Sequence, residues 1–349
     1  MQQTKIFICG NFGYKNNQLD GQTIKTRTLK DELVKRALNA QIVYTDTSYI
    51  KAKPFQVFKE IYTHFKSCSH LIMMPDKNAL KVLLPLYMLW NYKQKRDIRY
   101  VVIGGWLPNF LKGNQFYKNL TAKIDGVYVE ANEMKVNLEK IGLINATILP
   151  NFRDFDFKPM VHKKVTIPLK LVFFSRVFKE KGIEIAVGAV NHINRNHNEQ
   201  VVTLDIYGPI QERYKQDFFE IINRQEDSIK YNGILQPSEI HESLSVYDAM
   251  IFPTYYESEG FPGVVIDAFI AGLPIIASHW KYNAEFIKED VHGKLFRAND
   301  EKDLQEKIVY FINNPNQIDE MRANCIVQAR HYHVENVMEN LISDMKLSI

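Results

Sequence analysis

The segment PTYYESEGFPGVVIDAFIAGLP places the carboxylates of Glu259 and Asp267 eight positions apart, on either side of a Gly-Phe-Pro-Gly turn. Glu259 precedes the turn, and Asp267 follows Gly263 by four residues, on one face of a predicted helix. Pro262 suits the first helical position, and Gly260 lets backbone approach a ligand closely. The free N–H groups at such a helix start, with the positive end of its dipole, form an anion site. The segment therefore predicts a place where an anion, a sugar and a ribose are held together. In the alternative reading, Glu259 only caps the helix and Asp267 is a solvated helix residue.

Arg176 and Lys181 stand five positions apart in the sequence SRVFKEKG, which follows an apolar run at residues 169–174. Arg176 stands at the end of the predicted strand, and Lys181 enters the next predicted helix, so both can reach one anion. A departing pyrophosphate needs such charge, because negative charge builds on it as the bond to it breaks. Taken alone, the pair would be read as two exposed basic residues in a loop.

The elements that must position these residues are short apolar runs that alternate with helical patterns. This alternation is typical of βαβ units and parallel sheets. We predict six strands in the first half, at residues 5–9, 41–44, 70–74, 100–103, 126–129 and 147–149. Six more are predicted in the second half, at residues 169–174, 202–207, 229–231, 249–252, 274–277 and 293–296. The predicted fold class is α/β, with two Rossmann-like doubly wound domains that face each other across a cleft. Ligands of such sheets bind beyond the carboxyl ends of the strands.

A chain of 349 residues has the length of two domains of ordinary size. We place an N-terminal Rossmann-like domain at residues 1–152 and a Pro-bearing linker at 153–168. A C-terminal Rossmann-like domain follows at 169–325. A last helix at 326–349 is expected to cross back to the first domain.

The acid pair and the basic pair together resemble family 4 retaining glycosyltransferases, which have the GT-B fold. The first segment is similar to the E-x7-E signature of that family, and residues 175–182 are similar to its Gly-Arg-Leu-x-x-x-Lys-Gly motif. The resemblance is specific over residues 169–304 and general over residues 1–150. The chain departs from the pattern twice: Asp267 replaces the second Glu, and Ser175 replaces the first Gly.

The resemblance implies that the N-terminal domain binds the acceptor and that the C-terminal domain binds the nucleotide-sugar. It also implies a role for each matching residue. Arg176 and Lys181 would stabilise the departing diphosphate, Glu259 would bind donor-sugar hydroxyls, and Asp267 would bind the ribose. It implies further donor contacts at Ser175, Gly208, Gly233, Gly260, Phe261, Gly263 and Val264. Neither a metal nor another cofactor is expected, because two fixed cations replace one, and the leaving phosphate can accept the acceptor proton.

The first half offers less specific candidates. A Gly-bearing loop after the first strand and a second loop after residue 103 are expected to face the donor and the acceptor; their candidate residues are Gly13, Asp20, Gly21, Gln22, Gly105 and Trp106. In the alternative readings, Asp20 caps a helix and Trp106 packs a turn.

Charge is distributed unevenly along the chain. Residues 1–150 carry a net charge of +11, and residues 151–349 carry −7, within a total of +4. The basic half suggests an anionic partner, which we expect to be a membrane surface rather than nucleic acid. Residues 77–99 join apolar side chains to Lys93, Lys95 and Arg96, as interfacial segments do; an internal helix followed by a solvated turn is the equal alternative. Three widely spaced cysteines and the absence of a signal-like start predict a cytoplasmic protein, peripheral on the inner membrane face.

These observations predict an enzyme, a hexosyltransferase that moves sugar from a UDP-sugar to a lipid-linked glycan in cell-surface polysaccharide synthesis. Two alternatives stay open: a GT-B sugar-nucleotide epimerase, and a non-catalytic nucleotide- or sugar-binding protein. Neither a dinucleotide-binding G-x-G-x-x-G nor a P-loop motif occurs in the sequence.

Overall fold

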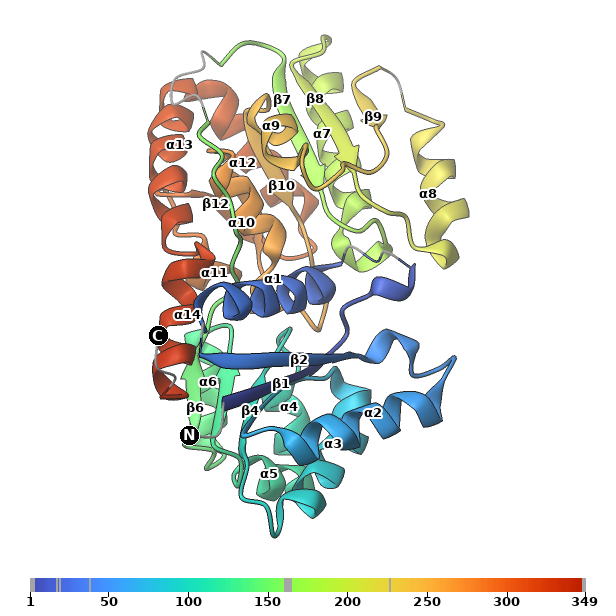
Figure 1. Ribbon diagram of the computed structural model, residues 1–349. Helices are drawn as coiled ribbons and strands as arrows, with labels where there is room; N and C mark the ends of the chain where they lie inside the picture. Colours follow the sequence, from blue (N-terminus) through green and yellow to red (C-terminus); the bar gives the residue numbers. More distant parts are fainter. Residues whose placement is uncertain are drawn as a thin grey trace. The chain divides into compact units, whose positions relative to one another are not determined.

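The computed structural model describes residues 4–346, except 17, 19, 38, 160–164 and 226 (Figure 1). The chain divides into two compact units. The first unit comprises residues 1–154, 260–262 and 332–349, and the second comprises residues 155–259 and 263–331. The tripeptide at residues 260–262 belongs to the first unit, although the residues on either side of it belong to the second.

The first unit is built on a six-stranded parallel sheet of order β2-β1-β3-β4-β5-β6. Its strands are β1 (Thr4–Gly10), β2 (Ala40–Asp46), β3 (His70–Met74), β4 (Asp97–Val101), β5 (Gly126–Val129) and β6 (Ala146–Ile148). Nearly all of β1, β3, β4 and β5 is buried, as expected for strands covered on both faces. The switch point of this sheet lies between β1 and β3, because β2 is added on one side of β1 and the later strands are added on the other.

Seven helices belong to the described part of the first unit. They are α1 (Gly21–Arg36), α2 (Pro54–Ser67), α3 (Lys77–Asn91), α4 (Leu107–Lys112), α5 (Gln115–Thr121), α6 (Asn132–Lys140) and α14 (Val334–Asp344). Helix α1 begins with a capping box, in which the Asp20 side chain accepts from Thr23 N and the Thr23 hydroxyl accepts from Asp20 N. The alternative reading of Asp20 as a helix cap therefore describes what this residue does in the structure.

Helix α3 contains most of the segment predicted to be interfacial. Leu83, Leu84 and Tyr87 are buried in the core, whereas Leu89 is 70% exposed and Tyr92, just beyond the helix, is 84% exposed. The helix is thus an internal element of the α/β unit whose far end remains apolar and open to solvent.

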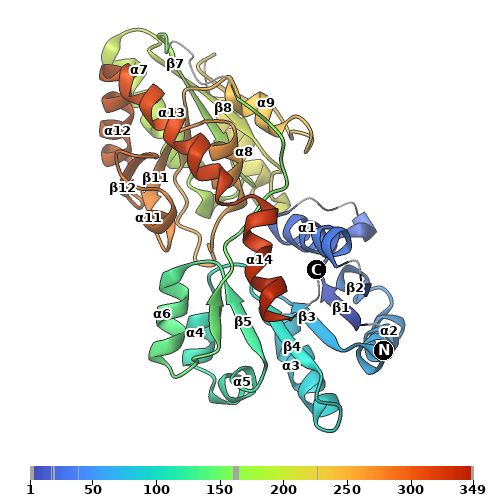
Figure 2. The ribbon, with the colours of Figure 1, turned by 60° about the vertical axis from the view of Figure 1, so that its left-hand side comes forward.

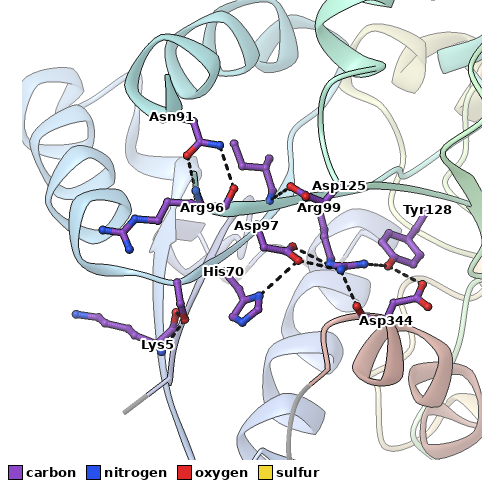
Figure 3. Close-up of polar contacts among 11 residues, drawn as sticks. Lys5, His70, Asn91, Arg96, Asp97, Arg99, Asp125, Tyr128 and Asp344 are labelled. Carbon is purple, nitrogen blue, oxygen red and sulfur yellow. Dashed lines mark hydrogen bonds and ion pairs between the residues drawn. The ribbon is translucent and has the colours of Figure 1, made fainter. Parts of the chain in front are cut away.

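The last helix, α14, packs on the first sheet beside α1 (Figure 2). Its apolar side chains join a core with Ile6, Ile8, Leu29 and Leu33. A polar network fixes its end (Figure 3): Arg99 Nη2 donates to the carbonyl oxygen of Asp344 at 2.7 Å. Tyr128 OH also donates to Asp344 Oδ2 at 2.9 Å.

The second unit carries a six-stranded parallel sheet of order β12-β11-β10-β7-β8-β9. Its strands are β7 (Leu169–Phe174), β8 (Val202–Tyr207), β9 (Ile229–Tyr231), β10 (Ala249–Phe252), β11 (Ile275–His279) and β12 (Gly293–Arg297). This is the doubly wound order of Rossmann sheets, and its switch point lies between β7 and β10. Every one of the twelve predicted strands is present.

The described helices of the second unit cover this sheet. They are α7 (Ile183–His197), α8 (Lys215–Ile222), α9 (Ile240–Ser245), α10 (Gly263–Ile270), α11 (Asn283–Phe286), α12 (Glu301–Asn313) and α13 (Pro315–Arg330). Helices α7 and α12 pack on one face, where Leu171, Phe173 and Leu204 point toward them. Within the described ranges, none of the helices combines the length and the hydropathy required to span a bilayer.

Candidate functional site

The predicted donor-site residues lie beyond the carboxyl ends of two neighbouring strands of the second unit. Strand β7 leads into Ser175 and Arg176, and β10 leads into the loop that ends at Glu259. These two strands are hydrogen-bonded neighbours at the switch point of the sheet. In open α/β sheets this is the place where ligands bind, because the two following connections diverge and leave a crevice.

The core of this site is a buried ion pair. Lys181 Nζ lies 2.5 Å from Glu259 Oε2, although the residues are 78 positions apart in the chain. Thr254, which is fully buried, donates its hydroxyl to the same carboxylate oxygen at 2.9 Å. The sequence places Lys181 and Glu259 in separate motifs, and the structure joins them in one hydrogen-bonded cluster.

The surroundings of Lys181 disfavour its charged form. Burial lowers the pKa of Lys181, the neighbouring Glu259 carboxylate opposes that effect, and the positive charge of Arg176 adds to the lowering. The ammonium also lies 5.4 Å from the ring centre of Phe252 and 5.6 Å from that of Tyr256. The aromatic faces partly compensate for lost hydration, since they attract cations.

The turn that delivers Lys181 depends on Gly182. This glycine is the N-cap of α7 and has a φ of +76°, and a Cβ on it would lie 2.2 Å from the carbonyl oxygen of Pro253. Only glycine permits this approach. Gly182 therefore brings the connection after β7 against the connection after β10, and this closeness lets Lys181 reach Glu259.

Arg176 differs from Lys181 in being open to solvent. Its guanidinium lies 5.4 Å from the ring centre of Phe178, and the described residues provide no carboxylate partner for it. Arginine presents a planar set of five N–H donors that match phosphate oxygens. Arg176 is therefore the exposed cation of this site, and Lys181 is the buried one.

Three further predicted donor-site residues lie close together. Gly208 has a φ of +137°, and a Cβ on it would lie 1.8 Å from the carbonyl oxygen of Ser175. Its N–H donates to Gly233 O at 2.8 Å, and its own carbonyl accepts from Tyr231 OH at 3.0 Å. The structure thus gathers Ser175, Gly208 and Gly233 at the carboxyl ends of β7, β8 and β9.

Asp267 lies on α10 and is 4% exposed. Its Oδ1 lies 3.3 Å from His241 Nε2, so the shortened acid already has an interaction partner within the protein. The alternative reading of Asp267 as a solvated helix residue is wrong, since the side chain is buried. Gly263 and Val264 form the first turn of α10, where backbone N–H groups lack intrahelical acceptors.

The predicted candidates of the first unit follow β1 and β4. Gly13 has a φ of +64°, and a Cβ on it would lie 2.7 Å from Thr23 Cγ2, so it closes the loop onto α1. Gly21 opens α1, and Gln22 Nε2 donates weakly to Met74 O at 3.4 Å.

The second loop of this unit, after β4, holds Gly105 and Trp106. Trp106 donates its indole N–H to Ile103 O at 3.0 Å and meets the Phe110 ring edge-on. Both contacts are those of a residue that packs a turn, although part of the Trp106 side chain remains exposed.

Sequence reasoning missed the buried pair Lys25–Glu130 in the first unit. Lys25 Nζ lies 2.7 Å from Glu130 Oε1, and the two side chains are 0% and 2% exposed. One signal was available: Lys25 precedes Leu29 and Leu33 at intervals of four, which places the lysine on the inner stripe of α1. Glu130 directly follows the buried strand β5.

Two hollows lie away from these residues. One, of about 310 Å³, adjoins Arg99, Asp125 and Asp344 in the first unit, and another, of about 640 Å³, adjoins Gln225 and Lys230 in the second. Neither contains a predicted site residue. The described residues contain no group of three or more His, Cys, Asp or Glu side chains that could hold a metal ion.

The structure thus combines two doubly wound parallel sheets with two cations and an acid at the switch point of the second. The family model described as Glycosyl transferases group 1 matches residues 154–332, just over half of the chain. The chain therefore belongs to this family.

Comparison with solved structures confirms the predicted GT-B fold. HepE from Anabaena, solved in complex with UDP and glucose, has a TM-score of 0.75 and 15% identity, and covers 98% of this chain and 99% of HepE. Sucrose-phosphate synthase from Thermosynechococcus elongatus has a TM-score of 0.77 and 15% identity, with 98% of each chain covered.

One curated relative is the amylovoran biosynthesis glycosyltransferase of Erwinia amylovora. It is 24% identical over 170 residues, which cover 48% of this chain and 40% of that protein. The chain spans about half the length of the curated relatives that it matches.

Proposed function

We propose that this protein transfers a hexose from a UDP-sugar to a glycan acceptor in the synthesis of a cell-surface polysaccharide. The observation that carries the proposal is the Lys181–Glu259 pair beside the exposed Arg176 at the switch point of the second sheet. The UDP and glucose bound in the HepE structure, and the amylovoran pathway of the Erwinia relative, support the donor and the product class.

Each residue has a defined part in the proposed reaction. Arg176 and Lys181 bind the diphosphate and stabilise the negative charge that it gains as the glycosidic bond breaks. Glu259 accepts hydrogen bonds from hydroxyls of the donor sugar, while its ion pair with Lys181 keeps both side chains oriented. Asp267, held by His241, is proposed to meet the ribose, and the first turn of α10 supplies N–H donors.

We further propose that the reaction retains the anomeric configuration, as in family 4. In this mechanism the departing phosphate oxygen takes the proton of the acceptor hydroxyl, so no side-chain base is required. Two protein cations at the diphosphate also make a metal unnecessary. Transfer should therefore persist after treatment with EDTA, and proton NMR of the product should show the donor's anomeric configuration.

The acceptor is proposed to be lipid-linked and presented at an anionic membrane surface. The exposed end of α3 combines apolar Leu89 and Tyr92 with the exposed cations Lys93 and Lys95. Exposed apolar side chains enter the headgroup region while lysines interact with anionic lipid. The double charge reversal K93E/K95E should abolish co-sedimentation with vesicles that contain phosphatidylglycerol. Unchanged binding would rule out this surface.

The donor is tested by measuring the melting temperature with UDP, GDP and ADP. A ligand that binds only the folded state raises the melting temperature, so UDP should produce the largest increase. The variant R176A should lose most of that increase, whereas K179A, a nearby exposed lysine, should keep it. If no nucleotide changes the melting temperature of the wild type, the proposal is wrong.

Product analysis separates transfer from the two alternatives. A transferase releases UDP only in the presence of an acceptor, whereas an epimerase converts the donor without one. A binding protein that lacks catalysis would show the increase in melting temperature and no turnover with any acceptor.

A further inference from the structure

A short tripeptide of the donor loop belongs to the first unit and not to the second. Gly260, Phe261 and Pro262 follow Glu259 directly in the chain. Phe261 is 2% exposed, and its ring meets the Tyr332 ring edge-on at 4.7 Å. Contacts that hold this tripeptide therefore also restrict the backbone of Glu259, the residue that the proposed function assigns to the donor sugar.

Both backbone polar groups of Phe261 are bound by buried side chains. Its N–H donates to Glu130 Oε2 at 3.0 Å, and its carbonyl accepts from Asn151 Nδ2 at 3.0 Å. Glu130 and Asn151 are 2% and 4% exposed. They follow the neighbouring strands β5 and β6, so the tripeptide lies at the carboxyl edge of the first sheet.

Both oxygens of the Glu130 carboxylate accept hydrogen bonds. Oε2 accepts from Gly104 N at 3.2 Å as well as from Phe261 N, while Oε1 accepts from Lys25 Nζ at 2.7 Å. Gly104 follows β4, and Lys25 lies on α1. Burying a carboxylate costs free energy unless it is paired with a cation and hydrogen-bonded. The Glu130 carboxylate has both kinds of partner.

The packing around Gly260 excludes any side chain at this position. A Cβ on Gly260 would lie 2.3 Å from Glu130 Oε2 and 2.8 Å from the Cα of Gly104. A glycine at position 260 is thus required because Glu130 lies so close, whether or not a ligand also approaches the backbone here. The sequence alone suggested only the approach to a ligand.

We propose that Glu130, oriented by Lys25, is a positioning residue for Glu259. Glu130 holds the backbone of Gly260–Phe261 in place. Because Glu259 is joined to Gly260 by a peptide bond, this also restricts the position of Glu259. The effect on catalysis rests on the proposed function. The hydrogen bond between Glu130 and Phe261 N does not depend on any substrate. Small displacements of reacting groups can reduce turnover about a hundred-fold.

The test combines hydrogen exchange with kinetics on the full chain. In E130Q, the peptide that contains Phe261 should exchange its amides faster than in the wild type, because one acceptor of the network is lost. Turnover with the UDP-sugar should decrease about ten- to a hundred-fold. Most of the increase in melting temperature caused by UDP should be retained, since Arg176, the exposed cation of the site, lies outside the Glu130 network.

The variant D248N is the matched control. Asp248 is equally buried, pairs with Arg322 and lies at the amino end of β10. It should reduce stability without increasing exchange at Phe261, and its turnover should match that of the wild type at temperatures where it is folded. If E130Q does not fold, N151A removes the bond to the Phe261 carbonyl and should show the same pattern.

The proposal is wrong if exchange at Phe261 is unchanged in these variants, or if turnover decreases no more than in D248N. Failure of the proposed function has a different signature. In that case the wild type shows neither an effect of UDP nor turnover, while the exchange difference between wild type and E130Q persists.

Discussion

Lys181 and Glu259 form one hydrogen-bonded unit, with Nζ and Oε2 2.5 Å apart and both residues almost completely buried. The cation expected at the diphosphate and the acid expected at the sugar are therefore electrostatically coupled. A change in one alters the charge and orientation of the other. Thr254 contributes a third contact to the same oxygen, which restricts the carboxylate further.

Removal of one member of this pair should be costly for stability. In K181M or E259Q, a buried group is left without its partner, and each variant should lose about 3 kcal/mol of unfolding free energy. The double variant K181M/E259Q should lose less than the sum of the two, because no unpaired charge remains. Urea denaturation of all four proteins measures this coupling.

The exposed pair Lys281–Glu257 provides the control for that cycle, since Glu257 is 69% exposed. The same cycle with K281M and E257Q should give a coupling below about 1 kcal/mol. Equal coupling energies for the two pairs would show that burial does not strengthen the Lys181–Glu259 interaction.

The variant G260A should reduce both stability and transfer. Its Cβ would lie 2.3 Å from Glu130 Oε2, so either the carboxylate or the tripeptide must move. We expect a cost of about 1–3 kcal/mol, typical of overpacking, and a loss of turnover. The matched variant G113A places its Cβ in open space and should behave as the wild type does. Thermal melts and initial rates measure the two effects.

The hydroxyl of Tyr128 should stabilise the attachment of α14. It accepts from Arg99 Nη1 at 2.5 Å and donates to Asp344 Oδ2 at 2.9 Å (Figure 3). The variant Y128F leaves both groups without this partner and should lose about 1–3 kcal/mol in urea denaturation. Tyr92 is 84% exposed, so Y92F should have no measurable effect, and a similar loss in both variants would contradict the assignment.

Asp97 should make stability depend on acid. Burial alone would raise the pKa of Asp97, but hydrogen bonds from His70 and Arg99 outweigh it and hold the pKa below the ordinary 3.8. The unfolded chain therefore binds the proton first as pH falls. The stabilisation is complete above the unfolded pKa and is lost as pH falls through the folded pKa.

Denaturant titrations between about pH 6 and pH 2 test this dependence. The variant D97N should be less stable than the wild type at pH 6, and the difference should decrease as the solution is acidified. A constant difference across this range would show that Asp97 contributes by packing rather than by its charge.

The three cysteines should be unreactive in the folded protein. Each is fully buried, and burial raises the pKa of Cys9 to about 12 and that of Cys68 to about 11. The pKa of Cys325 is raised as well, for the same reason. Since the thiolate is the reactive form, a disulfide reagent at about pH 8 should label none of them. In denaturant it should label all three, and rapid labelling without denaturant would contradict the burial.

The sequence by itself determined the fold class and the two segments that carry Arg176 and Glu259. Alternating apolar runs predicted all twelve strands, because a buried parallel strand needs continuous apolar residues and a crossover helix needs a 3.6-residue period. The segments around Arg176 and Glu259 were recognisable because their glycines, prolines and charges lie within a few positions of one another. Local spacing was sufficient for these features.

The tertiary structure decided which distant residues meet. Lys25 and Glu130 are separated by 105 positions, and each looks like an ordinary charged residue in its own segment. Likewise, the pairing of Lys181 with Glu259 depends on the parallel contact of β7 and β10, which no local pattern encodes. Burial of a charge is tolerated only where the fold supplies a partner, and that partner is set by strand order rather than by proximity in the chain.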